Sequence, residues 1–227
     1  MDESAVERTL AACEQALAGP GTPDLRALGF WRAVAAVKRR RELVDRYATR
    51  IATVDRQAFR RRVRLVFPVD LGIALVIGGL LVDLVFLAIA LPADHPWREL
   101  LVLIGAAGLD VASHGLAHLA VGALVGIGFT DWFLDLPKPP GFKIDYASYL
   151  RASPPSRAWM HAAGAIASKL TPFLVIPYAL AIDTEMWAVL ILVAFGIVQI
   201  VTDLVFSVKG SDWKKFRREM KLARSSV

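Results

Sequence analysis

The chain has 227 residues, 56% of which are hydrophobic, and its mean hydropathy is +0.48. This composition is too apolar for an ordinary soluble domain and is typical of a polytopic membrane protein. The formal net charge is +6, and the basic residues cluster before the first apolar run and after the last. Because these clusters flank apolar segments, we expect them to orient the protein in a lipid bilayer, and we expect no nucleic-acid partner. The single cysteine, Cys13, excludes an internal disulfide framework.

Residues 1–66 form the first predicted region, which is helical and cytoplasmic. The first thirty residues alternate polar and apolar positions and lack the continuous apolar run of a signal peptide. Asp24 follows a turn rich in glycine and proline, so we expect it to cap a long charged helix that runs from Leu25 towards Arg64. The basic runs at 38–41 and 60–62 are typical of solvated faces or of contacts to anionic lipid headgroups, with RNA or a protein partner as the alternative.

Residues 67–208 predict a transmembrane domain of four helices. Its apolar segments lie near 68–91, 100–129, 157–182 and 186–208. Each segment reaches the length of about 20 residues that a helix needs to cross the hydrocarbon core. A loop at 130–156 separates the second and third spans, and a basic tail covers 209–227. The predicted fold class is therefore an all-α integral membrane protein.

The charges of the loops predict the orientation. Lysine and arginine crowd the residues before the first span, the loop at 130–156 with Lys138, and the tail that begins at Lys209. The two remaining loops carry only Arg98. Basic loops stay on the cytoplasmic side. We therefore expect a multi-pass protein of the cell membrane with both termini and the loop at 130–156 in the cytoplasm.

Three histidines and an aspartate inside the spans predict a metal site. His114 and His118 are four residues apart, which places them on one face of a helix. Counted from the outer surface, they lie at depths of about 21 and 27 Å, Asp203 at about 25 Å and His161 at about 24 Å. Two imidazoles and the Asp203 carboxylate would supply three positions of a tetrahedral zinc site and leave the fourth open to water. His161 is a further candidate ligand; helix-to-helix hydrogen bonding is the alternative role for these side chains.

Asp110 and Lys169 are expected to support this site. Asp110 lies one helical turn before His114 and could accept a hydrogen bond from that imidazole. Alternatively it pairs with Lys169 of the third span, whose depth is similar. We favour the ion pair.

The order of these motifs resembles the site-2 protease family of intramembrane zinc metalloproteases. In that family an HExxH helix supplies two zinc ligands and a later Leu-Asp-Gly segment supplies the third. The resemblance covers about half of the chain, from Leu100 to Val208, and it implies that His114, His118 and Asp203 are the zinc ligands. The segment Ala162–Ala167 is similar to the Ala-Gly-Pro helix start of the family, without its proline.

Two positions depart from the family pattern. Gly115, in His-Gly-Leu-Ala-His, occupies the place of the catalytic glutamate, and Leu204 replaces the glycine after the family's aspartate. A general base contributes about 10²- to 10⁴-fold to the rate, and glycine has no side chain for this role. We therefore expect a non-peptidase, or pseudoprotease, that binds a membrane client or is a metal-stabilised scaffold. The alternative is an active intramembrane metalloprotease or lipid-directed metallohydrolase with a non-standard general base.

Overall fold

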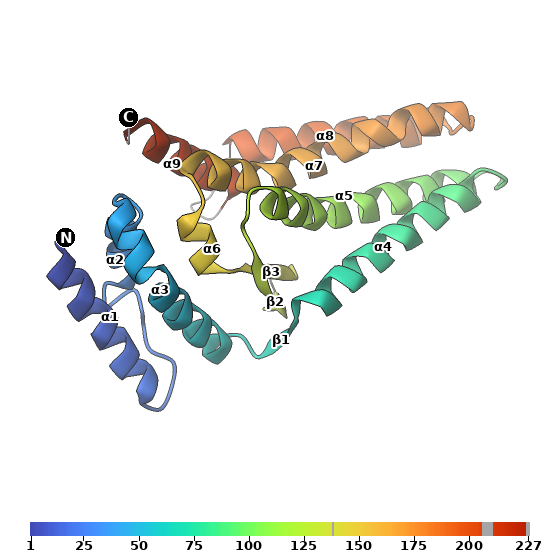
Figure 1. Ribbon diagram of the computed structural model, residues 1–227. Helices are drawn as coiled ribbons and strands as arrows, with labels where there is room; N and C mark the ends of the chain where they lie inside the picture. The colour runs from blue at the N-terminus through green and yellow to red at the C-terminus, as the bar shows by residue number, and fades with distance from the viewer. Residues whose placement is uncertain (138, 206–210, 226–227) are drawn as a thin grey trace. The chain divides into compact units, whose positions relative to one another are not determined.

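The computed structural model describes residues 1–137, 139–205 and 211–225, most of which are helical (Figure 1). Four helices are long and apolar enough to cross a membrane, which confirms the prediction of a multi-pass membrane protein. They are α4 (Val69–Ala90), α5 (Trp97–Leu124), α7 (Pro154–Ala181) and the first 18 residues of α8 (Met186–Val205). The predicted end of the last span at 206–208 and the charges of Lys138 and Lys209 lie outside the described residues.

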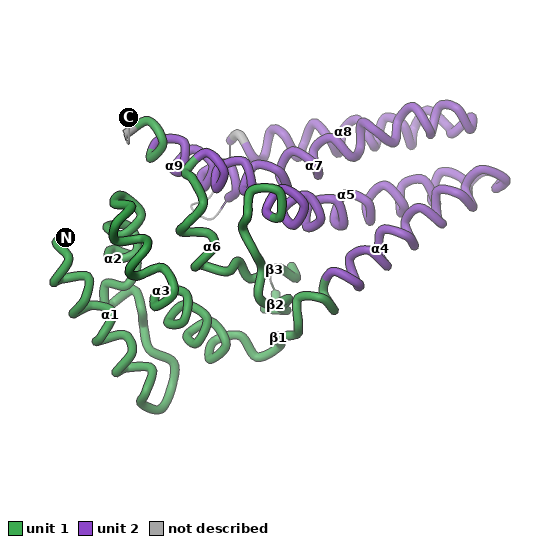
Figure 2. Tube along the Cα trace, in the orientation of Figure 1, with its two compact units in different colours: residues 1–72, 123–154, 222–227 green, residues 73–122, 155–221 purple. Residues whose placement is uncertain are grey.

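The chain forms two compact units (Figure 2). Unit 1 comprises Met1–Gly72, Ala123–Pro154 and Leu222–Val227, and unit 2 comprises Ile73–Gly122 and Pro155–Lys221. The loop at 130–156, which we assigned to the transmembrane domain, therefore groups mainly with the N-terminal region.

Three helices build the core of unit 1. The first, α1 (Glu3–Ala18), begins at Asp2, whose carboxylate accepts a hydrogen bond from the backbone N–H of Ala5 at 2.8 Å. Its buried residues recur at helical spacing and are Val6, Leu10, Cys13 and Leu17. They pack with α2 (Phe30–Val37) and α3 (Arg41–Arg62) in one apolar cluster. Cys13 is therefore a core residue.

The prediction of one long helix from Leu25 is wrong. The Asp24 carboxylate caps a turn by accepting from the N–H of Arg26 at 2.8 Å. Gly29 then adopts a left-handed backbone with φ of 82°, and α2 begins at the next residue. A second break follows at Arg40, which is extended with φ of −134°, before α3 begins. Backbone geometry at these two residues thus divides the predicted helix.

The described chain is mostly helical, as the predicted all-α membrane class requires, and a small antiparallel sheet in unit 1 adds to the helices. Its order is β1 (Leu65–Pro68), β2 (Phe129–Leu134) and β3 (Gly141–Ile144). Aromatic and β-branched residues, which favour strands, fill these segments. The short helix α6 (Tyr146–Arg151) follows β3, and its Leu150 joins the core cluster of the three N-terminal helices.

The sheet is joined to α3 by buried charge pairs. The Asp131 side chain on β2 is only 1% exposed, and its carboxylate lies 2.5 Å from Arg60 Nη2 and 3.3 Å from Arg56 Nε. Lys143 of β3 pairs with the buried Asp55 of α3. Buried carboxylates need such partners, so these pairs fix the sheet against the helix.

Unit 2 contains the membrane-spanning helices and most of α9 (Asp212–Ser225). Its apolar cluster includes Ala90 of α4, Val102 and Ala106 of α5, Ala179 of α7 and Leu192 of α8. Many other leucines, isoleucines and valines of these helices are exposed, as a lipid-facing surface requires. Residues 212–225 of the predicted basic tail thus form a helix that belongs largely to the transmembrane unit.

The charge pair of Asp131 predicts a pH-dependent stability. Burial alone raises the pKa of this carboxyl, but hydrogen bonds from Thr130 and from the two arginines outweigh burial, so its pKa lies below the ordinary value. A lowered pKa in the folded state stabilises the fold above the unfolded pKa, and this contribution is lost as the pH falls through the folded pKa. We expect Asp131→Asn to lower the free energy of unfolding by about 2 kcal/mol at pH 7.

Thermal unfolding in detergent between pH 7 and pH 3 checks this expectation. The difference in melting temperature between the parent and Asp131→Asn should narrow as the pH falls below about 4. Asp45→Asn on α3 is the control, because the Asp45 side chain is 63% exposed and its carboxylate lies 3.8 Å from Arg41 Nε. A difference that stays constant over this pH range would show that the ionised carboxylate is not the source of the stability.

Candidate metal centre

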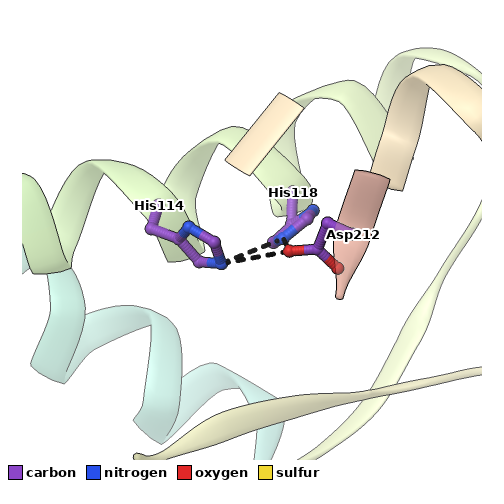
Figure 3. Close-up of side chains that lie close together, drawn as sticks. All are labelled: His114, His118 and Asp212. Atoms are coloured by element: carbon purple, nitrogen blue, oxygen red, sulfur yellow. Dashed lines mark hydrogen bonds and ion pairs between the residues drawn. The ribbon is translucent and has the colours of Figure 1, made fainter. Parts of the chain in front are cut away.

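His114, His118 and Asp212 form a compact group that could hold a metal ion. The histidines lie one turn apart on α5, and Asp212 is the first residue of α9. His118 Nε2 lies 3.2 Å from His114 Nε2 and 3.3 Å from Asp212 Oδ2, and the third distance, from His114 Nε2 to Asp212 Oδ2, is 3.5 Å. Figure 3 shows the two imidazoles and the carboxylate pointing toward one another.

The three distances match one face of a zinc tetrahedron. Bonds of about 2.0 to 2.1 Å to nitrogen and oxygen give a tetrahedron with edges of about 3.3 to 3.4 Å. The observed triangle has edges of 3.2, 3.3 and 3.5 Å. Two imidazoles and one carboxylate are also a donor set that zinc accepts. The residues therefore fit this ion and would leave its fourth position to another ligand.

The hydrogen bonds of the imidazoles direct their lone pairs to the centre. His118 Nδ1 lies 2.7 Å from the carbonyl oxygen of Met160, which can only accept, so Nδ1 donates. Nε2 of neutral His118 then carries a lone pair. His114 Nδ1 lies 3.5 Å from Ser168 Oγ, whose hydroxyl donates to the carbonyl of Gly164 at 3.1 Å, which assigns the same tautomer to His114.

Three acceptor atoms therefore face one another, and a cation between them would offset their mutual repulsion. A proton on one Nε2 can bridge a single pair of these atoms, whereas one divalent ion can bind all three. The contact from His118 to Met160 is also the kind of outer hydrogen bond that orients a metal-binding histidine. The protonation pattern and the triangle thus point to the same occupant.

The carboxylate of Asp212 is held in its ionised form. Its second oxygen, Oδ1, lies 2.9 Å from Lys215 Nζ, which leaves Oδ2 for the histidines. Burial alone raises the pKa of Asp212, but the charge of the Lys215 ammonium and its hydrogen bond to Oδ1 lower it, and the pKa lies well below its ordinary value. A position in the first turn of α9 further favours negative charge.

Gly164 of α7 lets the two helices approach at the centre. A Cβ atom built at this position would overlap the imidazole of His118, with Nε2 as the nearest atom. Since Nε2 is the atom that would bind the ion, a larger residue at 164 would displace the ligand itself. The Ala-Gly segment of α7 thus has a steric role beside the histidines.

The structure assigns Asp203, Lys169 and Asp110 other partners than we expected. Asp203 Oδ2 lies 2.5 Å from Lys169 Nζ, in an ion pair between α8 and α7. Asp110 accepts a hydrogen bond from Gln199 Nε2 at 3.1 Å. The favoured pair of Asp110 with Lys169 is thus replaced by a pair with Asp203, because calculated depth gives the level of a residue but not the face of its helix.

His161, the further candidate, is buried on α7 with 4% of its surface exposed. It does not join the described residues that could share one ion. Its neighbour Met160 contributes instead, through the carbonyl oxygen that orients His118. His161 thus follows directly after a residue that contacts His118, but it is not part of the triangle.

The sequence does not single out Asp212 as a ligand, because it lies outside the apolar spans, in a tail in which basic residues predominate. The available signal was local: Ser211-Asp212 precedes a segment with helical spacing, and an acid is favoured at such a helix start. The backbone N–H of Lys215 donates to the Ser211 carbonyl at 3.1 Å, as expected for that start.

Substituting Gly164 tests the geometry of the centre. We expect Gly164→Ala to weaken zinc binding about 10-fold or more, because the added methyl displaces His118 Nε2. Gly78→Ala on α4 is the matched control, since a Cβ there meets nothing within 4 Å. Competition with a chelator of known affinity measures both variants. Equal zinc affinities in the two variants would contradict this packing.

Comparison with known proteins matched nothing: no family model, no curated protein and no solved structure is similar to this chain. The likeness to site-2 proteases therefore stays a prediction from the motifs.

Proposed function

We propose that this protein is a metal-stabilised scaffold of the cell membrane, a non-peptidase related to site-2 proteases. In this proposal both termini are cytoplasmic, and zinc bound by His114, His118 and Asp212 fastens helix α9 to the end of the membrane-spanning bundle. The supporting observation is the triangle of donor atoms, whose third member comes from α9.

Further contacts support a fastened α9. Arg157 of α7 and Glu219 of α9 form an ion pair at 2.7 Å, and their side chains are 3% and 1% exposed. The rings of Trp159 and Phe216 meet edge to face with their centroids 5.6 Å apart. A metal ion at the start of the same helix would add a cross-link between α9 and α5. Binding energy that is available only in the folded state stabilises that state.

The surroundings of the centre favour a structural role over hydrolysis. Gly115 lies between the two histidines and offers no carboxylate as a general base. Three acids on the neighbouring helices are already engaged: Asp203 with Lys169, Glu219 with Arg157, and Asp110 with Gln199. When bound, zinc would polarise a water in its fourth position, but none of these acids is free to take its proton.

One observation favours hydrolysis as the second candidate. The His114 side chain is 42% exposed, so a small molecule can reach the centre from that side. An enzyme of this kind would need a base from elsewhere, such as the substrate itself. Chelator-sensitive cleavage of a peptide or ester by the purified protein would favour this candidate.

A pair of aspartate variants tests the proposal. We expect the purified full chain and Asp203→Asn to bind about one zinc per chain, and Asp212→Asn to lose it. Zinc at a free concentration of about 100 times its dissociation constant should stabilise the binding-competent chains by about 2.7 kcal/mol. Metal analysis and thermal unfolding with and without zinc measure both effects. His118→Ala should behave as Asp212→Asn does.

The two carboxylates are matched controls for each other. Both belong to residues near the end of the chain that the structure places in an ion pair. Zinc that is lost in Asp203→Asn and kept in Asp212→Asn would restore the ligand set implied by the family resemblance. A parent chain that neither binds nor responds to zinc would overturn the proposal.

A further inference from the structure

A pocket of about 530 Å³ lies in unit 1 where the chain passes from α3 through β1 into α4. Three arginines line it: Arg56 and Arg60 on α3, and Arg64 just after the end of that helix. They follow one another at intervals of four residues, which places the first two on one helix face. The proposed zinc centre plays no part in this pocket.

The arginines keep donors available for an anion. The buried Asp131 accepts from Arg60 at 2.5 Å and from Arg56 at 3.4 Å and so orients both guanidinium groups. Each guanidinium has five N–H donors, more than this carboxylate can accept. Arg64 is exposed and has no ion-pair partner among the described residues. Asp70 also lines the pocket but is exposed, so three cations face two acids and the balance is positive.

Thr130 also lines the pocket, together with apolar residues at and just before the start of the membrane-spanning helix α4. Val66, Phe67 and Pro68 of β1 and Val69 of α4 line it. Since α4 is long and apolar enough to cross a membrane and begins at Val69, these residues lie where the chain enters the bilayer. Arginines beside apolar residues at the start of a membrane-spanning helix suit an anion that carries apolar chains better than they suit a small soluble anion.

We propose that this pocket binds the phosphate group of an anionic phospholipid. Arg64 and the outward N–H groups of Arg60 donate to the phosphate oxygens, and the apolar wall receives the glycerol and the first part of the acyl chains. Arginine is well suited to phosphate because its planar fork can donate two parallel hydrogen bonds. Asp131 is a positioning residue, since it orients the arginines without contacting the lipid.

Thermal unfolding of the full chain in a neutral detergent tests the site. The probes are phosphatidylglycerol, phosphatidylcholine with the same acyl chains, and inorganic phosphate. We expect phosphatidylglycerol to raise the melting temperature saturably, and the other two to have little effect. Arg64→Gln should raise the half-saturating amount of phosphatidylglycerol about 10-fold or more, as the loss of charge-assisted hydrogen bonds implies.

Arg62→Gln is the matched control, because Arg62 lies at the same end of α3 but is not among the described residues that line the pocket. An equal loss in Arg62→Gln and Arg64→Gln would mean diffuse surface attraction and would overturn the site. An equal rise in melting temperature with phosphatidylcholine or with inorganic phosphate would also overturn the site. Arg64→Lys keeps the positive charge but loses the planar guanidinium group, so we expect an affinity for phosphatidylglycerol between those of the parent and Arg64→Gln. An affinity equal to that of the parent would overturn the proposed paired hydrogen bonds.

Discussion

Three acceptor atoms that face one another are the constraint on which the proposed account of this protein depends. The hydrogen bond from His118 to Met160 and the one from His114 to Ser168 direct the Nε2 lone pairs of both imidazoles towards the carboxylate of Asp212. Without a cation, these atoms would repel each other in a half-buried place, which is costly. The separations of 3.2 to 3.5 Å are those of ligands around one small ion. The fit of this triangle to zinc is therefore the main support for a metal-dependent structure.

The origin of the third ligand separates the proposed scaffold from a protease. A ligand from a membrane-spanning helix would complete a site within the bundle, whereas Asp212 belongs to the helix after the last span. An ion at this place would tie the end of the chain to α5, beside the buried pair of Arg157 and Glu219. Together with Gly115 between the two histidines, this position supports the proposal that an ion here would have a structural role.

Local sequence predicts some of these features and not others. Apolar length is a local property, so the four spans, with the pair of histidines on one helix face, could be predicted. Strand pairing is not local: Leu65 pairs with Leu134, and each segment alone is too short to be recognised. Depth along a helix placed Asp203 at the level of the histidines, but the direction of its side chain, towards Lys169, depends on how the helices pack. The proximity of Asp212 to the histidines is a tertiary contact between α9 and α5, which local sequence does not encode.

The most direct test of the account is amide hydrogen exchange of α9 in the purified full chain, with and without a zinc chelator. If zinc joins α9 to α5, its removal should speed exchange of the α9 amides about 10-fold or more and leave the amides of β2 unchanged, because local opening of the helix no longer has to break metal bonds. Unchanged exchange in α9 after zinc has been removed would contradict the account.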